Sequence, residues 1–372
     1  MHVNPAADAA QSVEIRIGAA RYEAVVGSNL LTTIGERAAV LIRGPRCAII
    51  VDNNTANLFS ASVQRSLQTA GFEPIIITIP SGENSKSLEQ AGAVCAQMAV
   101  AELDRTSFVV ALGGGVVGDL AGFAAAIYHR GIPHVQVPTT LLAQVDSSIG
   151  GKTAVNTPAG KNLLGAVHQP VLVIADIETL QTLPPRELKQ GFAEIVKHAV
   201  IADASLLEVA QASSLRPGDN ASWKLALPNL VARNVEIKAA IVERDEHDRG
   251  GERAILNFGH TVGHAIERAA GYGRFLHGEA ISLGMVAACE VSVRRAGLRE
   301  EEREQVVATL EAFHLPTRLP ADFPRTAIMP ALAADKKFVN GQVRFVVSSR
   351  LGSARVADDV TMQDIAAAID TL

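Results

Sequence analysis

The first half of the chain alternates short apolar runs with amphipathic segments. Residues 13–17 and 21–26 alternate polar and apolar positions around a Gly-Ala-Ala turn, which predicts a β-hairpin. Buried strands are then expected at residues 47–52, 74–79, 107–112, 134–137 and 171–175, with helices at 55–70, 87–103 and 119–128. Ser87 and Gln90 have the spacing of a helix-capping box. Strands that alternate with helices indicate a mostly parallel sheet with helices on both faces.

The second half is dominated by helical periodicity. Before it lies a segment rich in Gly, Lys, Asn and Thr, residues 138–170, which is expected to be a long loop, and loops of that length are usually functional. After a Leu-Pro-Pro-Arg break, helices are expected at 187–201, 223–243, 261–270, 279–295 and 301–313, and one strand at 342–348. We therefore predict an α/β domain over residues 1–183 and a mainly α-helical domain over residues 184–372.

Composition narrows the class of protein. A chain of 372 residues exceeds one core of usual size, which agrees with two domains. The net charge of −5 argues against nucleic acid as a partner. Neither a membrane-spanning apolar stretch nor the pattern of a secretory signal is visible, so a cytoplasmic protein is expected. Cys47, Cys95 and Cys289 are far apart among apolar neighbours and are interpreted as reduced core residues.

A glycine motif predicts a dinucleotide site. Gly113, Gly115 and Gly118 form a GxGxxG pattern directly after a predicted strand and before a helix, where the backbone can approach a pyrophosphate and unpaired N–H groups face it. The alternative is a glycine turn that serves close packing and binds no ligand. The acidic residue expected about 20 residues after the motif is missing. However, Asp52 ends an earlier strand, and residues 82–86 follow the next one, so both could reach the same ligand.

Histidines predict a metal site. His260 and His264 are four residues apart and project from one helix face, and His277 follows soon after. Glu194 lies among apolar neighbours, where a lone carboxylate would be costly. A catalytic metal needs about three protein ligands and an open position. Spacing alone does not decide whether His264, His277 or His198 joins His260. Imidazoles with a carboxylate suit Zn²⁺, with Co²⁺ or Fe²⁺ as alternatives.

Several cations predict an anion site. They lie on glycine-rich turns of the long loop, near the candidate metal ligands, or in apolar contexts: Lys152, Lys161, Lys197, Arg253, Lys238, Lys336 and Lys337. For any single lysine, a solvated surface charge is the usual explanation. So many in a chain of net negative charge indicate a focused anion site, as a substrate with phosphate and carboxylate groups would need.

Five motifs of this chain resemble those of one family, and the match to that family runs in order from about Glu14 to the C-terminus. They are GGGVVGD at 113–119, PTTLLAQVDSSIGGK at 138–152, GKN at 160–162, AEIVK at 193–197 and NFGHTVGHAIE at 257–267. The chain resembles the 3-dehydroquinate synthases of the sugar phosphate cyclase superfamily. The resemblance implies a Rossmann-like α/β domain that binds NAD and a mainly α-helical C-terminal domain that carries a divalent metal, Zn²⁺ or Co²⁺.

The resemblance also assigns roles to residues. Glu194, His260 and His277 match the family's metal ligands, so His264 takes a substrate-side role. The matches to cofactor contacts are Asp52, Glu83, Lys86, Gly115, Val116, Val117, Gly118, Asp119, Thr139, Thr140, Asp146, Lys152, Lys161, Thr179 and Thr182. The matches to substrate and catalytic groups are Lys152, Asn162, Asn257 and His264 at the phosphate, Lys238, Arg253 and Lys336 or Lys337 at the carboxylate, and Lys197. Arg130 resembles a residue that reaches the phosphate from a neighbouring subunit, which implies a homodimer.

The implied reaction turns 3-deoxy-D-arabino-heptulosonate 7-phosphate into 3-dehydroquinate and phosphate, in the shikimate route to aromatic amino acids. NAD⁺ oxidises C5 transiently with the metal as Lewis acid, phosphate leaves by β-elimination, the hydride returns, and the opened ring closes by an intramolecular aldol step. Three alternatives are a sister cyclase acting on another ketose phosphate, a metal-dependent polyol dehydrogenase and a non-enzymatic nucleotide sensor.

Overall fold

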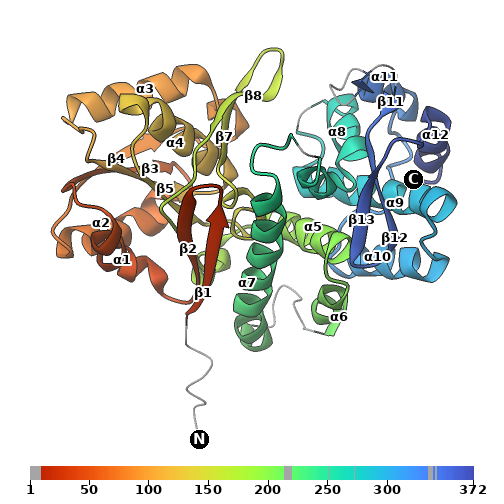
Figure 1. Cartoon of the computed structure of the whole chain (residues 1–372), viewed down its shortest axis with the longest axis horizontal. Helices are drawn as coiled ribbons and strands as arrows, with labels where there is room; N and C mark the ends of the chain where they lie inside the picture. Colours follow the sequence, from red (N-terminus) through yellow and green to blue (C-terminus); the bar gives the residue numbers. More distant parts are fainter. Residues whose placement is uncertain (1–9, 213–219, 250, 272, 334–337, 340–341) are drawn as a thin grey trace, which may run out of the picture. The chain divides into compact units, whose positions relative to one another are not determined.

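The computed structural model describes residues 10–212, 220–249, 251–271, 273–333, 338–339 and 342–372. The chain forms two compact units (Figure 1). The first unit contains Met1–Leu183 and Leu227–Ala239, and the second contains Pro184–Ala226 and Ala240–Leu372. The first is an α/β unit and the second is mainly helical, so the predicted fold class is confirmed. The short segment Leu227–Ala239 lies within helix α7 (Asn220–Arg244), and the periodicity of that helix does not reveal its membership of the first unit.

The first unit is built on a seven-stranded sheet of order β1-β2-β9-β6-β5-β3-β4. The strands are β1 (Gln11–Ile17), β2 (Ala20–Gly27), β3 (Arg46–Asp52), β4 (Glu73–Ile79), β5 (Phe108–Gly113), β6 (His134–Pro138) and β9 (Leu172–Asp176). Strands β1 and β2 form the predicted antiparallel hairpin, and every other pairing in this sheet is parallel. The carboxyl ends of the parallel strands therefore share one edge.

Helices cover both faces of the sheet, and each face has its own apolar core. They are α1 (Ile34–Leu41), α2 (Ala56–Thr69), α3 (Leu88–Val100) and α4 (Gly115–Ile127). Ile49 and Val51 of β3 pack in one core with residues of α1 and α2, whereas Ala48 and Ile50 pack in the other core with residues of α3 and α4. Burial on both faces explains why the strands read as continuous apolar runs. Ser87 Oγ accepts the expected capping hydrogen bond from Gln90 N–H (3.1 Å).

Two expectations about the first unit are wrong. Helix α4 begins at Gly115 rather than at residue 119, because the glycines of the motif enter its first turn. The expected loop 138–170 contains a π-helical turn (Ala143–Ser147) and a hairpin of β7 (Lys152–Thr157) and β8 (Gly160–Val167). Strand β8 is largely exposed, so its sequence lacks the alternation of a half-buried strand.

The second unit packs helices around α5 (Pro185–Ile201), most of which is buried. The others are α6 (Ser205–Ala212), α8 (His260–Ala269), α9 (His277–Ala296), α10 (Glu300–Ala312), α11 (Ile328–Ala333) and α12 (Met362–Ile369), with the hairpins β10 (Phe338–Val339)–β11 (Gln342–Val343) and β12 (Phe345–Arg350)–β13 (Ser353–Ala357). The single strand expected at 342–348 is wrong, because the chain divides at Arg344 between two hairpins. Helices α8 and α9 each begin directly at a histidine.

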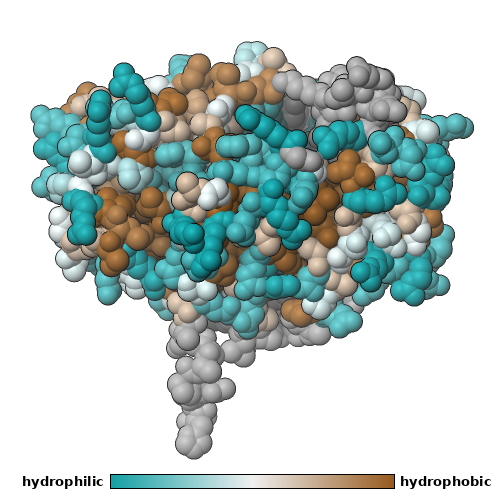
Figure 2. Space-filling model, viewed as in Figure 1, coloured by the Kyte–Doolittle hydropathy of each residue, from teal (hydrophilic) through white to brown (hydrophobic). Residues whose placement is uncertain are grey.

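The structure also describes the molecular surface and the three cysteines. Among the described residues, no helix is long and apolar enough to cross a membrane. On the face shown in Figure 2, hydrophilic side chains are spread between patches of apolar ones. Cys47, Cys95 and Cys289 are free thiols, and burial raises the pKa of Cys47 and of Cys289 to about 12. These two thiols are therefore inert core residues, as predicted.

A buried histidine in the first unit predicts a pH-dependent stability. His134, at the start of β6, is 1% exposed, and neither ring nitrogen has a hydrogen-bond partner among the described residues. Its ring stacks on His168 at 5.0 Å between centroids. Burial, aided by His168, lowers the pKa of His134 to about 3. The unfolded chain takes up a proton below about pH 6.5 that the folded chain excludes, so folding loses stability as the pH falls from 6.5 towards 3.

A His134→Phe variant should therefore be more stable than the parent, and by more at pH 5 than at pH 7. Protonation of the unfolded parent alone accounts for about 2 kcal/mol of this difference between the two pH values. Denaturant unfolding at both pH values measures it. His247→Phe, at a histidine whose side chain is 54% exposed, is the control and should leave the pH dependence unchanged. An identical pH dependence in His134→Phe and the parent would refute the prediction.

Candidate functional site

The glycine motif lies at the carboxyl edge of the sheet, where β5 meets α4. Gly114 is the N-cap of α4. A Cβ at Gly113 would lie 2.6 Å from Val117 Cγ2, and one at Gly114 would lie 2.9 Å from Thr140 Cγ2. The glycines therefore permit close packing of helix on strand. The N–H groups of the first turn, at Gly115, Val116 and Val117, have no partner within the helix and suit a phosphate group.

A polar network that is buried at Lys86 and exposed at Asn162 and Glu83 lies beside this turn. Lys86 is 5% exposed, and its Nζ lies 2.5 Å from Asp119 Oδ2 and donates to Asn162 Oδ1 at 2.5 Å. Asn162 has a left-handed backbone (φ 57°), and its N–H donates to Asn156 Oδ1 (2.9 Å). Asn156 Nδ2 in turn donates to Glu83 Oε1 (2.7 Å). Residues expected at the cofactor and at the substrate phosphate thus share one network, which joins the β7–β8 hairpin to the turn after β4.

Other predicted cofactor positions end neighbouring strands. Asp52 Oδ1 accepts hydrogen bonds from Asn54 N–H (3.0 Å), Thr55 N–H (2.9 Å) and Thr55 Oγ1 (2.7 Å), so this oxygen shapes the turn after β3. Thr139 is buried directly after β6, and its hydroxyl has no hydrogen-bond partner in the part of the chain that the structure describes.

Three further threonines in the predicted cofactor set also hold turns at this edge. Thr140 Oγ1 accepts from Ala143 N–H (3.2 Å), Thr179 Oγ1 donates to Asp176 O (2.7 Å), and Thr182 Oγ1 donates to Thr179 O (2.9 Å). These bonds fix the loops after β6 and β9.

The predicted substrate cations of the first unit differ in environment. Lys238 of α7 is 7% exposed, donates to Asp146 O (2.6 Å) and pairs with the Asp146 carboxylate. Lys152 and Lys161 are exposed on the β7–β8 hairpin. Arg130 is also exposed, on a turn in which His129, Arg130 and Gly131 all have positive φ (49°, 68° and 120°). Non-glycine residues rarely adopt this conformation, so the backbone at Arg130 is an unusual turn.

In the second unit, a carboxylate and imidazoles from three helices converge. Glu194 of α5 is fully buried, and its Oε1 lies 3.7 Å from His260 Nε2 and 3.6 Å from His277 Nε2. His260, His264 and His277 each offer a ligand atom within 4.8 Å of the other two. Two atoms that each bind one ion at about 2.1 Å with tetrahedral geometry lie about 3.4 Å apart. The observed separations therefore suit a single divalent ion. Neither His198, left open by the spacing, nor Glu194 is in this group of three, but Glu194 contacts two of its members at the distances given above.

The electrostatics also suit a metal. Burial would raise the pKa of Glu194, but the Lys197 ammonium and the two imidazoles hold the pKa well below its usual value. Glu194 is therefore ionised, and its buried Oε1 accepts no hydrogen bond from any residue that the structure describes. Burial would lower the pKa of His277, but Glu194 and Glu267 raise that pKa to about 9. Metal binding would replace this proton. His260 Nδ1 donates to Phe258 O (3.1 Å), which leaves Nε2 facing Glu194.

Glycines bring the three helices into backbone contact. A Cβ at Gly284 of α9 would lie 2.0 Å from Gly259 O, and one at Gly278 would lie 2.5 Å from Gln190 Cα on α5. Gln190 Oε1 also accepts from Gly278 N–H (3.2 Å). The start of α9, which carries His277, is thereby fixed against the helix that carries Glu194.

Three further predicted residues of the second unit precede α8 or lie on it: Arg253, Asn257 and His264. Arg253 and Asn257 begin and end a 3₁₀ helix (Arg253–Asn257), and Arg253 Nη1 donates to Glu246 O (2.6 Å). His264 is half-buried, one turn after His260. Lys336 and Lys337 lie outside the described residues.

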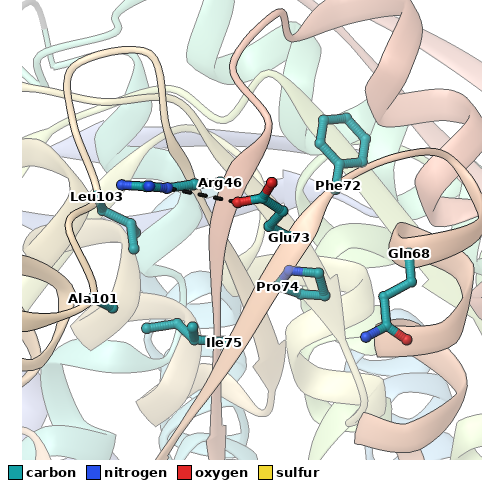
Figure 3. Close-up of a pocket in the computed structure, with 8 residues that line it drawn as sticks. All are labelled: Arg46, Gln68, Phe72, Glu73, Pro74, Ile75, Ala101 and Leu103. Atoms are coloured by element: carbon teal, nitrogen blue, oxygen red, sulfur yellow. Dashed lines mark ion pairs between the residues drawn. The ribbon is translucent and has the colours of Figure 1, made fainter.

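Two features were not predicted. Glu267 lies on the helix of His260 and His264, and its Oε2 is 3.6 Å from His277 Nδ1. The seven-residue spacing from His260 could have indicated it, since it places both on one face. The second feature is a cavity of about 370 Å³ at the amino ends of β3 and β4, lined by Arg46, Phe72 and Glu73 among others (Figure 3). It lies at the opposite ends of these strands from the predicted cofactor residues, and Glu73 already pairs with Arg46 there (3.6 Å).

Comparison with solved structures shows that the chain has the fold of the sugar phosphate cyclases, a class of enzymes. 2-epi-5-epi-valiolone synthase from Streptomyces hygroscopicus subsp. jinggangensis, solved with NAD⁺ and Zn²⁺ bound, is 30% identical, with a TM-score of 0.84 over 96% of this chain and 98% of that one. 2-deoxy-scyllo-inosose synthase, solved with carbaglucose-6-phosphate, NAD⁺ and Co²⁺, shares the fold, with a TM-score of 0.83 at 24% identity over 96% of this chain and 99% of that one.

Sequence comparison gives the particular family. The family model described as 3-dehydroquinate synthase N-terminal matches residues 76–190, and that described as 3-dehydroquinate synthase C-terminal matches residues 191–338. The 3-dehydroquinate synthase of Symbiobacterium thermophilum is 48% identical over 363 residues, which cover 96% of this chain and 99% of the relative. The chain belongs to the 3-dehydroquinate synthase family, and the resemblance carried by its motifs is confirmed.

Proposed function

We propose that this chain converts 3-deoxy-D-arabino-heptulosonate 7-phosphate to 3-dehydroquinate and phosphate, with NAD and a divalent metal, Zn²⁺ or Co²⁺, as cofactors. The observation that carries the proposal is the convergence of Glu194, His260 and His277 at distances that suit one ion, in a chain of this family. A non-enzymatic nucleotide sensor would not need this set.

The first unit supplies the proposed cofactor site. The N–H groups at Gly115–Val117 would bind the pyrophosphate, and Asp52 and the network of Lys86 and Asp119 would lie beside the remainder of the dinucleotide. The other assigned positions lie at or near the carboxyl edge of the sheet or on the adjoining hairpin. They are Glu83, Gly118, Thr139, Thr140, Asp146, Lys161, Thr179 and Thr182.

The substrate would be held by its two anionic ends. Lys152, Asn162, Asn257 and His264 are proposed to bind the phosphate, while Lys238, Arg253 and Lys336 or Lys337 are proposed to bind the carboxylate. Arg130 would reach the phosphate from a second copy of the chain, so we propose that the active form is a homodimer. The cytoplasmic location expected from the sequence remains a prediction.

These residues explain how one chain can support several steps. The bound metal and NAD would supply Lewis-acid and reversible hydride chemistry at the same carbon. Glu194, His260 and His277 hold the position of the ion, and the cationic groups keep one substrate in place while its phosphate leaves. Lys197, paired with buried Glu194, compensates the carboxylate charge and keeps that oxygen ligand ionised.

The direct test supplies 3-deoxy-D-arabino-heptulosonate 7-phosphate with a small, catalytic amount of NAD⁺. Phosphate release and NADH absorbance are followed together. Phosphate in large excess over NAD⁺, without steady NADH, supports an internal redox cycle. Turnover of sedoheptulose 7-phosphate alone would instead make the chain a sister cyclase. Steady NADH with a simple polyol and no phosphate release would make it a dehydrogenase.

Lys152→Ala should weaken binding of the phosphorylated substrate about 10-fold to 100-fold, because a charged hydrogen bond contributes about 1.5–3 kcal/mol. NAD affinity should change much less. Steady-state KM for the substrate and a separate NAD titration measure the two effects. Lys189→Ala, at a partly exposed lysine of α5, is the control. Equal losses for both ligands would show that Lys152 serves the cofactor or the fold.

A further inference from the structure

The two imidazoles that face Glu194 differ in what holds their second nitrogen. His260 Nδ1 donates to the backbone carbonyl of Phe258 (3.1 Å). His277 Nδ1 instead faces a carboxylate, since Glu267 Oε2 lies 3.6 Å away. Both Nε2 atoms point to the same oxygen of Glu194. Each imidazole therefore has an oxygen behind it, but only that of His277 comes from a side chain.

Glu267 is placed for this contact by its helix. It lies seven residues after His260 on α8, which brings both side chains to one face. It is 8% exposed, and burying a carboxylate is costly unless a partner compensates it. His277, at the first residue of α9, is such a partner. A neutral imidazole that binds a metal through Nε2 must carry its proton on Nδ1, which is the tautomer that a carboxylate at Nδ1 favours.

The position of the His277 backbone is fixed independently. Gly278 N–H donates to Gln190 Oε1 (3.2 Å), and Arg186 binds both oxygens of Glu279 (2.7 Å each). These contacts fix the start of α9 against α5 but leave the His277 ring free to rotate about its own side-chain bonds. The contact with Glu267 restrains that rotation.

We propose that Glu267 is a positioning residue for the metal site: it holds the His277 ring with Nε2 towards the ion. The proposal rests on the metal site proposed above. Glu267 does not contact the ion or the substrate in this role.

The test measures metal affinity directly, with Zn²⁺ in competition with a chelator and with Co²⁺ by its visible spectrum. Outer-sphere partners typically contribute 10-fold to 100-fold to metal affinity. Glu267→Leu, which keeps the volume but cannot accept a hydrogen bond, should lower Zn²⁺ affinity about 100-fold. Glu267→Gln, which can still accept one, should lower it about 10-fold and shift the Co²⁺ spectrum. Glu304→Gln, at a side chain 72% exposed, should change neither.

The outcomes separate this proposal from the proposed function. Parent-like Zn²⁺ affinity in Glu267→Leu, with parent-like NAD binding as evidence of folding, would overturn the positioning role. Retention of Zn²⁺ by His277→Ala would instead overturn the ligand assignment itself. If Glu267→Leu lost both NAD binding and metal, that variant would be judged misfolded and Glu267→Gln would be the test. Unchanged Zn²⁺ affinity and an unchanged Co²⁺ spectrum in Glu267→Gln would then overturn the proposal.

Discussion

A His277→Ala variant is expected to lose its metal and its activity while both units stay folded. His277 supplies one of three proposed ligand atoms, and Glu194 and His260 alone leave an ion with two protein ligands, fewer than the three of a usual catalytic site. The loss in affinity should exceed the roughly 100-fold that outer-sphere partners contribute. The fold should survive, because the His277 side chain is 33% exposed and the start of α9 is held by Gly278 and Glu279.

Metal-to-protein stoichiometry after dialysis, measured together with NAD binding, tests this expectation. His264→Ala is the informative comparison, since His264 lies in the same group of imidazoles but is assigned to the substrate. It should keep the metal and lose substrate affinity. His247→Ala, at an exposed histidine, should change nothing. Metal loss in His264→Ala with retention in His277→Ala would reverse the two assignments.

A Lys86→Met variant is expected to destabilise the first unit and weaken NAD binding. The side chains of Lys86 and Asp119 are 6% and 18% exposed, so the substitution leaves a nearly buried carboxylate without its cation. Breaking such a pair typically costs about 3–5 kcal/mol. Burial already raises the pKa of Asp119, and without Lys86 that pKa should rise further. The stability lost in Lys86→Met should therefore be smaller at low pH, where the Asp119 carboxyl of the folded variant is protonated and neutral.

Denaturant unfolding and an NAD titration measure both effects. The double variant Lys86→Met/Asp119→Asn removes both charges and should lose less stability than the sum of the single variants. Arg16→Met breaks an exposed ion pair with Glu14 in the same unit, whose side chains are 56% and 60% exposed, and should cost little. Strict additivity of the Lys86 and Asp119 variants would show that the pair is not coupled.

The sheet could be predicted closely because of how it is buried. Strand β3 was expected at 47–52 and spans Arg46–Asp52, and β5 was expected at 107–112 and spans Phe108–Gly113. Parallel strands covered on both faces are continuous apolar runs, which are conspicuous in sequence. Strand β8 was missed for the opposite reason, since its side chains are mostly exposed.

The candidate site could be predicted only in part from spacing. Four-residue spacing places His260 and His264 on one helix, but it does not report which side chain of another helix faces them. That depends on packing at glycines such as Gly278 and Gly284, where Cβ atoms would collide with the neighbouring backbone. Family motifs supplied the candidate ligand set, whereas Glu267, although it ends the motif at 257–267, was assigned no role.

Helix α7 has a consequence for how this chain can be divided. Its middle, Leu227–Ala239, belongs to the first unit, where Leu230 and Val235 are buried and Lys238 binds Asp146. A gene fragment that ends at Leu183 would encode the whole seven-stranded sheet, yet it would omit this helical segment and with it the Lys238 partner of Asp146. The α/β unit is therefore encoded by two separated stretches of the gene, and a single cut cannot release it intact.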